Sequence, residues 1–301
     1  MAKANSLKTI FYALGANFSI FLTKLAAAII TGSGAMAAEA VHSLADCGNQ
    51  LLLLLGMKSA KKPATPEHPL GHGKAIYFWS FLVALMLFSV GGTYSLYEGW
   101  HKLHDPEPLR RAWIAIAVLS FGVVAESFSM WGCLHEVNKA RGKRGILRWF
   151  RESRQSELIV IFGEDLAALL GLVFALIAIL LTILTGNPLF DAIGTLAIGV
   201  LLIVVAVFIA IEVKALLIGQ SVDPEVRDRI KAFLEARPEV VRVFNMITLQ
   251  LGPDVMISVK AEMRRDATAL DMVNAINAVE RDLKLEFPEI RWSFFEPDFE
   301  D

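Results

Sequence analysis

The chain has 301 residues, of which 55% are hydrophobic. Its 29 Lys and Arg nearly balance its 31 Asp and Glu, and the net charge of −2 gives no indication of a nucleic-acid partner. The two cysteines, Cys47 and Cys133, lack a CxxC spacing, which argues against a disulfide framework. The composition predicts a membrane protein with a soluble part attached.

Six apolar segments are long enough to cross a bilayer as helices, which takes about 20 residues each. The predicted spans cover residues 8–31, 36–57, 76–100, 112–134, 158–184 and 188–213. The N-terminus lacks a small-residue cleavage site after a short apolar core, so we interpret the first segment as a true span. We therefore expect an all-α, six-helix transmembrane domain over residues 1–215.

The basic residues of the loops predict the orientation, since loops rich in Lys and Arg stay in the cytoplasm. Basic residues crowd the loops after the second and fourth spans and are absent from the turns after the first and fifth. The loop after the third span is an exception, with Lys102, Arg110 and Arg111. We expect an integral protein of the bacterial inner membrane with both termini cytoplasmic. The basic loop after the fourth span can also attract anionic membrane lipid.

The last part of the chain, residues 216–301, changes character and predicts a cytoplasmic α+β domain. Asp223 as N-cap followed by Pro224 predicts a helix that runs to about Ala236. Two strands over 240–251 and 255–263, a helix over 266–287 and a strand over 290–295 follow. This αββαβ order predicts a ferredoxin-like unit of two layers.

Ionisable side chains within the second span are the first sign of a site. His42, Asp46 and Asn49 lie at i, i+4 and i+7 and share one helical face, and Glu39 lies at i−3. Charged groups are costly in hydrocarbon and survive there mainly where they bind, relay or pair. Imidazole and carboxylate suit a borderline metal such as zinc. The alternative is that His42 and Asp46 pair only with each other.

The fifth span carries two adjacent carboxylates, Glu164 and Asp165, with no basic residue to neutralise them. His42, Asp46 and Asp165 supply three candidate ligands from two helices. Glu164, Asn49 or a water is a candidate for the fourth, and four ligands suit tetrahedral zinc.

Other charged residues of the spans and loops leave alternatives open. His68 and His72, before the third span, can share a metal if their segment is helical, but Pro69 and Gly71 favour a structural turn. Lys24 in the first span can pair with a carboxylate. Glu98, Glu126 and Asp191 either line the pathway or form structural pairs.

These motifs together resemble the cation diffusion facilitator family over nearly the full chain. The resemblance rests on the run from His42 to Asp46 (HSLAD), the span-five acid, the segment from His68 to Lys74 (HPLGHGK) and the segment from Asn187 to Ala192 (NPLFDA). The runs around His42 and Glu164-Asp165 most resemble the branch that includes vertebrate zinc transporter nine. In many relatives a His or Asp stands four residues before the span-five aspartate, where this chain has Ile161.

The resemblance implies divalent-metal export by proton exchange in a homodimer, with His42, Asp46 and Asp165 as the transport site. Zinc is the expected cargo because imidazole suits it, while manganese, iron, cobalt and nickel are alternatives. A passive metal channel and a non-transporting membrane scaffold are the competing functions. No nucleophile–base constellation or phosphate loop indicates an enzyme, and no catalytic cofactor is expected.

Overall fold

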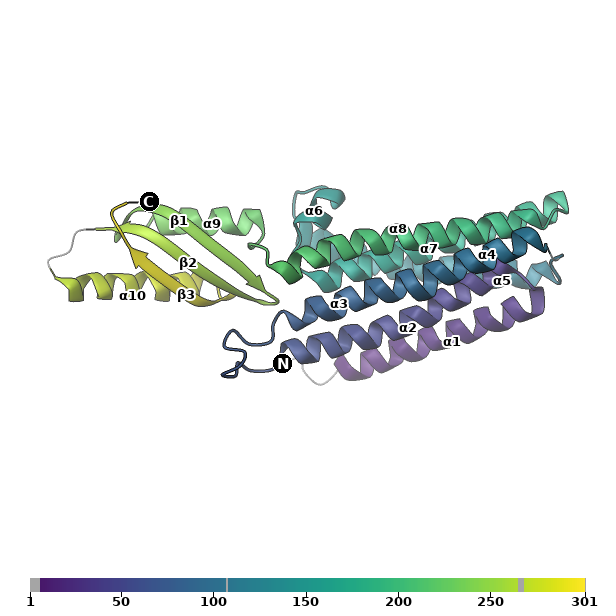
Figure 1. Cartoon of the computed structure of the whole chain (residues 1–301), viewed down its shortest axis with the longest axis horizontal. Helices are drawn as coiled ribbons and strands as arrows, with labels where there is room; N and C mark the ends of the chain where they lie inside the picture. The colour runs from purple at the N-terminus through teal and green to yellow at the C-terminus, as the bar shows by residue number, and fades with distance from the viewer. Residues whose placement is uncertain (1–5, 107, 265–267, 301) are drawn as a thin grey trace.

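The computed structural model describes residues 6–106, 108–264 and 268–300, with side chains of the first helix described from residue 17. Long helices form a bundle at one end of the molecule, and a small αβ domain lies at the other end (Figure 1). The two long loops of the bundle, around residues 61–74 and 142–155, lie at the end that faces this domain. The predicted fold class is therefore confirmed.

Each predicted span corresponds to a long helical segment of the described residues. The segments are α1 (Ser6–Thr31), α2 (Gly34–Ala60), the continuous run of α3 (Ala75–Met86), the π-helical η1 (Leu87–Gly92) and α4 (Thr93–His104), then α5 (Ala112–Arg141), α7 (Ser156–Thr185) and α8 (Leu189–Ile218). By length and composition, four of these described segments are able to cross a membrane: 75–104, 112–141, 156–185 and 189–218. Helix α2, with 27 residues, is nearly as long but carries more polar residues, and the described side chains of α1 make a shorter apolar stretch, 17–31.

The helix ends differ from the predicted ones. The fourth span was predicted to end at residue 134, but α5 continues to Arg141, because its last turns carry polar and charged residues that are stable as helix in water. A short helix in the basic loop, α6 (Ile146–Glu152), was not predicted. Helix α8 continues to Ile218, and Leu216 is buried in the core of the bundle. The division of the chain at residues 215 and 216 stays a prediction.

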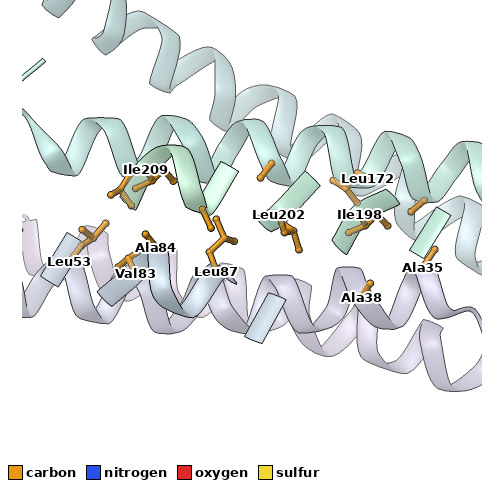
Figure 2. Packing of buried hydrophobic residues seen from close by; sticks show 14 of the residues in the cluster. Ala35, Ala38, Leu53, Val83, Ala84, Leu87, Leu172, Ile198, Leu202 and Ile209 are labelled. Atoms are coloured by element: carbon orange, nitrogen blue, oxygen red, sulfur yellow. The ribbon is translucent and has the colours of Figure 1, made fainter. Parts of the chain in front are cut away.

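Aliphatic side chains on facing helices form the core of the bundle (Figure 2). Leu202 and Ile209 of α8, Val83 of α3 and Leu87 of η1 are fully buried there. Apolar lipid supplies little hydrophobic drive between helices, so close packing and small interface residues hold a bundle together. Gly199 of α8 is such a residue: a Cβ there would lie 2.8 Å from the backbone nitrogen of Leu96.

The small domain contains α9 (Pro224–Glu235), β1 (Val240–Leu251), β2 (Asp254–Met263), α10 (Ala269–Glu286) and β3 (Ile290–Pro297). The strands lie in the order β1-β2-β3, with β1 antiparallel and β3 parallel to β2. Side chains of both helices, such as Ile230 and Leu283, share one core with alternate β2 residues such as Ile257. Asp223 caps α9 as predicted. The predicted helix start at 266 lies outside the described residues, and α10 is described from Ala269 with a capping box at Thr268.

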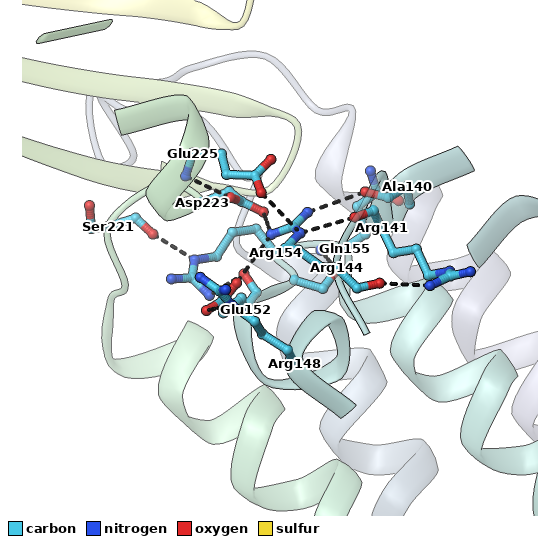
Figure 3. Close-up of polar contacts among 11 residues, drawn as sticks. Ala140, Arg141, Arg144, Arg148, Glu152, Arg154, Gln155, Ser221, Asp223 and Glu225 are labelled. Atoms are coloured by element: carbon cyan, nitrogen blue, oxygen red, sulfur yellow. Dashed lines mark hydrogen bonds and ion pairs between the residues drawn. The ribbon is translucent and has the colours of Figure 1, made fainter. Parts of the chain in front are cut away.

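Side chains of the basic loop after α5 form hydrogen bonds with the segment that leads into the small domain (Figure 3). The Nη1 of Arg144 donates to Asp223 Oδ2 at 2.5 Å and to Glu152 Oε2 at 3.4 Å, and the Arg144 side chain is 8% exposed. Arg154 donates to the carbonyl oxygen of Ser221 at 2.6 Å. Part of the basic charge of this loop therefore holds the start of the small domain.

Candidate metal site

Several buried polar atoms of helix α2 lack hydrogen-bond partners in the described part of the chain. His42 is 1% exposed, and neither of its ring nitrogens has a hydrogen-bond partner among the described residues. Its Nδ1 lies 3.7 Å from Asp46 Oδ1, which is itself without a hydrogen bond in that part of the chain. Buried polar groups are normally satisfied, so each exception needs an explanation. A bound ligand is one explanation, and these atoms are good metal donors.

A cavity of about 230 Å³ lies beside Asp46, among helices α1, α2, α5 and α7. Its lining includes four carboxylates: Asp46, Glu126, Glu164 and Asp165. In the described part of the chain none of the four forms a salt bridge with a Lys or Arg. Such a concentration of negative charge within a membrane is stabilised by a bound cation or by protons.

The carboxylates of α7 are held differently. Asn49 of α2, which is fully buried, donates from Nδ2 to Glu164 Oε1 at 2.5 Å. Asp165 accepts from the hydroxyl of Ser129 on α5, which lies 3.3 Å from each of its oxygens. Glu164 thus faces α2 and Asp165 faces α5, as expected for neighbours about 100° apart around a helix.

The structure brings only some of the predicted site residues together. Asp46, Glu164 and Asp165 line one cavity, His42 contacts Asp46, and Asn49 bonds Glu164. Among the described residues, however, no three His, Cys, Asp or Glu side chains converge closely enough to hold one metal ion. The assembled four-ligand site therefore stays a prediction, in which these donors would have to draw closer around the cation. Ile161, at the position of the family's other donor, is 39% exposed.

His68 and His72 lie in the loop before α3, in a turn, as Pro69 and Gly71 favoured. Their ring centroids are 4.4 Å apart, and the Nδ1 of His72 lies 3.2 Å from the carbonyl oxygen of Pro63. Gly71 has a φ of 73°, which ends any continuous helix between the two histidines. Metal binding by this pair stays a prediction.

Two partners of the site were not identified from the sequence. Glu39 does not join His42 and Asp46 but forms an ion pair with Lys24, at 3.0 Å between Nζ and Oε2. The position of Lys24 within an apolar span did indicate a partner, but it did not indicate which carboxylate. Ser129 gave no signal, because serines are common in membrane helices and its role depends on how α5 faces α7.

Comparison with known proteins agrees with the fold. Residues 10–218 match the model of the cation efflux transmembrane domain. The chain belongs to the cation diffusion facilitator family. It is 33% identical over 286 residues, 94% of its length, to the mitochondrial proton-coupled zinc antiporter SLC30A9 of Xenopus laevis. It is 28% identical to metal tolerance protein C4 of Arabidopsis thaliana over 83% of its length.

A bacterial member also matches. The cation-efflux pump FieF of Klebsiella pneumoniae is 26% identical over 90% of the chain and 85% of the pump. The chain spans about half the length of the curated zinc antiporter it matches, 50% for the Xenopus protein. It is an integral membrane protein of a transporter family.

Proposed function

We propose that the protein exports zinc from the cytoplasm in exchange for protons. One observation carries the proposal: His42 is buried without a hydrogen-bond partner beside Asp46. Asp46 in turn lines a cavity together with three other carboxylates. The mixed nitrogen and oxygen donors favour zinc over manganese, which prefers oxygen. The zinc antiporters among its relatives support both the cargo and the coupling.

The cavity residues supply the chemistry of exchange. Metal binding requires neutral imidazole and ionised carboxylates, so a cation that binds at His42, Asp46 and Asp165 displaces protons. When the site opens to the other side, protons return to these groups and the metal leaves. Imidazole is suited to this exchange because its reference pKa is about 6.5. Glu164 or Asn49 is proposed as the fourth donor.

Transport in proteoliposomes with a zinc indicator outside and a pH dye inside tests the proposal. Zinc flux should be accompanied by proton counter-flow and should rise with the pH gradient. His42→Ala should lower zinc flux at least tenfold, because the site loses its one nitrogen donor from imidazole. His135→Ala is the matched control, since His135 is exposed at the end of α5, beside Trp131, and should leave flux unchanged.

Other results identify the alternatives. Zinc flux without proton movement indicates a passive channel. A scaffold is indicated when wild type itself carries no zinc, so that Asp46→Ala makes no difference. The same assay with manganese, iron, cobalt and nickel ranks the cargo. If one of these metals is transported faster than zinc, that metal replaces zinc as the proposed substrate.

We also propose a homodimer in the bacterial inner membrane, with both termini cytoplasmic. The sheet of the small domain supports the dimer, because its face opposite the helices exposes Ile247 (58%) and Phe294 (55%) in one row across Ser258. Exposed apolar patches commonly mark interfaces. Loss of the dimer in an Ile247→Lys variant, measured by light scattering with detergent correction, tests the surface.

A further inference from the structure

A buried ion pair joins α1 to α2 one helical turn before His42. Lys24 Nζ lies 3.0 Å from Glu39 Oε2 and donates to the hydroxyl of Ser43 at 2.9 Å. The Lys24 and Glu39 side chains are 2% and 0% exposed. Removing two charges from water costs several kcal/mol per ion, which their attraction only partly returns. A pair at this depth in a membrane domain is therefore expected to have a function.

The pair borders the acidic cavity. Ser43, which accepts from Lys24, lines that cavity together with Asp46 and Glu126. Lys24 itself lines a second cavity of about 320 Å³ between α1 and α5, and Glu126 lines both cavities. An ammonium group thus stands beside the place proposed for a divalent cation.

Glu39 is fixed where it neutralises that ammonium group. Its Oε2 is bound to Lys24, and its Oε1 is buried against α7, where a Cβ at Gly171 would lie 2.5 Å away. Gly171 therefore provides the space that Glu39 occupies. Held in this way, Glu39 faces Lys24 and α7, and it is absent from the lining of the acidic cavity.

We infer that Lys24 and Glu39 set the net charge beside the transport site: Glu39 cancels the repulsion that Lys24 would otherwise exert on a divalent cation. Both are positioning residues, because they act through the cavity carboxylates rather than by touching the metal. The inference rests on the proposed function, since it concerns the affinity of the same site for its cargo.

Zinc binding to the full-length protein in detergent tests the inference, with the dissociation constant measured by competition with a chromophoric chelator. Glu39→Gln leaves Lys24 uncompensated and should raise the dissociation constant about tenfold, because repulsion between a single and a double charge is strong at low dielectric. Lys24→Met should not raise it. The double variant Lys24→Met/Glu39→Gln should return to within threefold of wild type.

Conservative and remote variants separate charge from folding. Glu39→Asp keeps the charge and should bind nearly as wild type does. Lys102→Met is the matched control, because it breaks another buried pair, 3.7 Å between Lys102 Nζ and Asp191 Oδ2. That pair lies at the start of α2, where Asp191 accepts from the backbone nitrogen of Gly34, about 12 Å along the helix from His42. The Lys102→Met variant should have a lower melting temperature than wild type and an unchanged affinity for zinc.

The outcomes distinguish this inference from the proposed function. A dissociation constant for Glu39→Gln within twofold of wild type overturns the charge role. Equal weakening in Glu39→Gln and Lys24→Met indicates a structural pair and also overturns it. A wild-type protein that binds zinc and transports none contradicts antiport, while the affinities of the variants still decide the inference. A wild-type protein that binds no zinc overturns both.

Discussion

At the scale of single residues, the polar groups of the bundle differ in how firmly they are held. Asn49 donates to Glu164 at 2.5 Å, whereas the hydroxyl of Ser129 lies at 3.3 Å from both oxygens of Asp165. Long, shared hydrogen bonds contribute less than short ones. Asp165 is therefore the carboxylate of α7 that is freer to turn toward a cation.

Substitution of Asp165 and of its partner should separate ligation from positioning. Asp165→Asn keeps the size and removes the charge, and it should raise the dissociation constant for zinc at least tenfold. Ser129→Ala removes one hydrogen bond worth about 1 kcal/mol and should raise it about fivefold. Competition with a chromophoric chelator measures both.

Ser127→Ala is the control for Ser129→Ala. Its hydroxyl donates to the carbonyl oxygen of Val123 on its own helix, so zinc affinity should not change. Unchanged binding in Asp165→Asn would remove Asp165 from the metal site and leave Asp46 and Glu164 as the cavity acids to test next.

The sequence predicted those contacts of the site that lie within one helix. His42 and Asp46 were expected to meet because residues four apart share a helical face, and their closest polar atoms are 3.7 Å apart. The pairs between helices, Asn49 with Glu164 and Lys24 with Glu39, were not predicted. They depend on how each helix is rotated against its neighbours, and hydropathy does not encode that rotation.

At the scale of elements, hydropathy located the helices but not their irregularities. The third span contains the π-helical segment η1, which no sequence pattern indicated. Such segments are usually single-turn insertions and are frequent at functional sites. Here Gly91 and Gly92 of η1 bring it against α8, where a Cβ on Gly92 would lie 2.6 Å from Ile203 Cγ1.

The contact of α4 with α8 should be sensitive to glycine substitution. A side chain at Gly199 would meet the backbone of Leu96, which cannot move aside as a flexible side chain can. Gly199→Val should therefore cost about 1–3 kcal/mol through overpacking and lower the melting temperature of the detergent-solubilised protein. Intrinsic tryptophan fluorescence during heating measures the change.

Gly132→Ala provides a control of opposite sign. Apart from the adjoining backbone of its own helix, no described atom lies within 4 Å of a Cβ built at Gly132, which lies inside α5. Alanine is favoured over glycine in a helix by about 1 kcal/mol, so this variant should be unchanged or more stable. Equal melting temperatures for Gly199→Val and wild type would show that α4 and α8 are not closely packed.

At the scale of the whole molecule, the order of elements predicted the small domain, but not how it attaches. The αββαβ order and the Asp223 cap both came from local signals. The attachment uses groups far apart in the sequence: the backbone nitrogen of Gly252 donates to the Tyr77 hydroxyl at 3.0 Å, and Arg144 reaches Asp223. Such contacts exist only once both parts have folded.

The ion pair between Arg144 and Asp223 should control how firmly the domain is held. Arg144→Gln removes the contact with Asp223 at 2.5 Å and should speed hydrogen exchange of backbone amides in residues 219–223. Asp223→Asn should give the same change while α9 stays capped, because asparagine is as good an N-cap as aspartate. Mass spectrometry of peptic fragments after exchange reports both.

The effect of Arg144→Gln on hydrogen exchange should depend on pH in a defined way, and a surface variant serves as its control. A hydrogen bond from Arg148 lowers the pKa of Glu152, the second carboxylate on Arg144. A carboxyl group with a lowered pKa stabilises the fold above its unfolded pKa of about 4.3, and that contribution is lost only as pH falls through the folded value. The difference between Arg144→Gln and wild type should therefore be constant from pH 6 to pH 8, after correction for intrinsic exchange. Arg227→Gln breaks an exposed pair with Asp228 and should show the same hydrogen exchange as wild type. If Arg144→Gln also exchanged at the wild-type rate, the loop would not hold the domain.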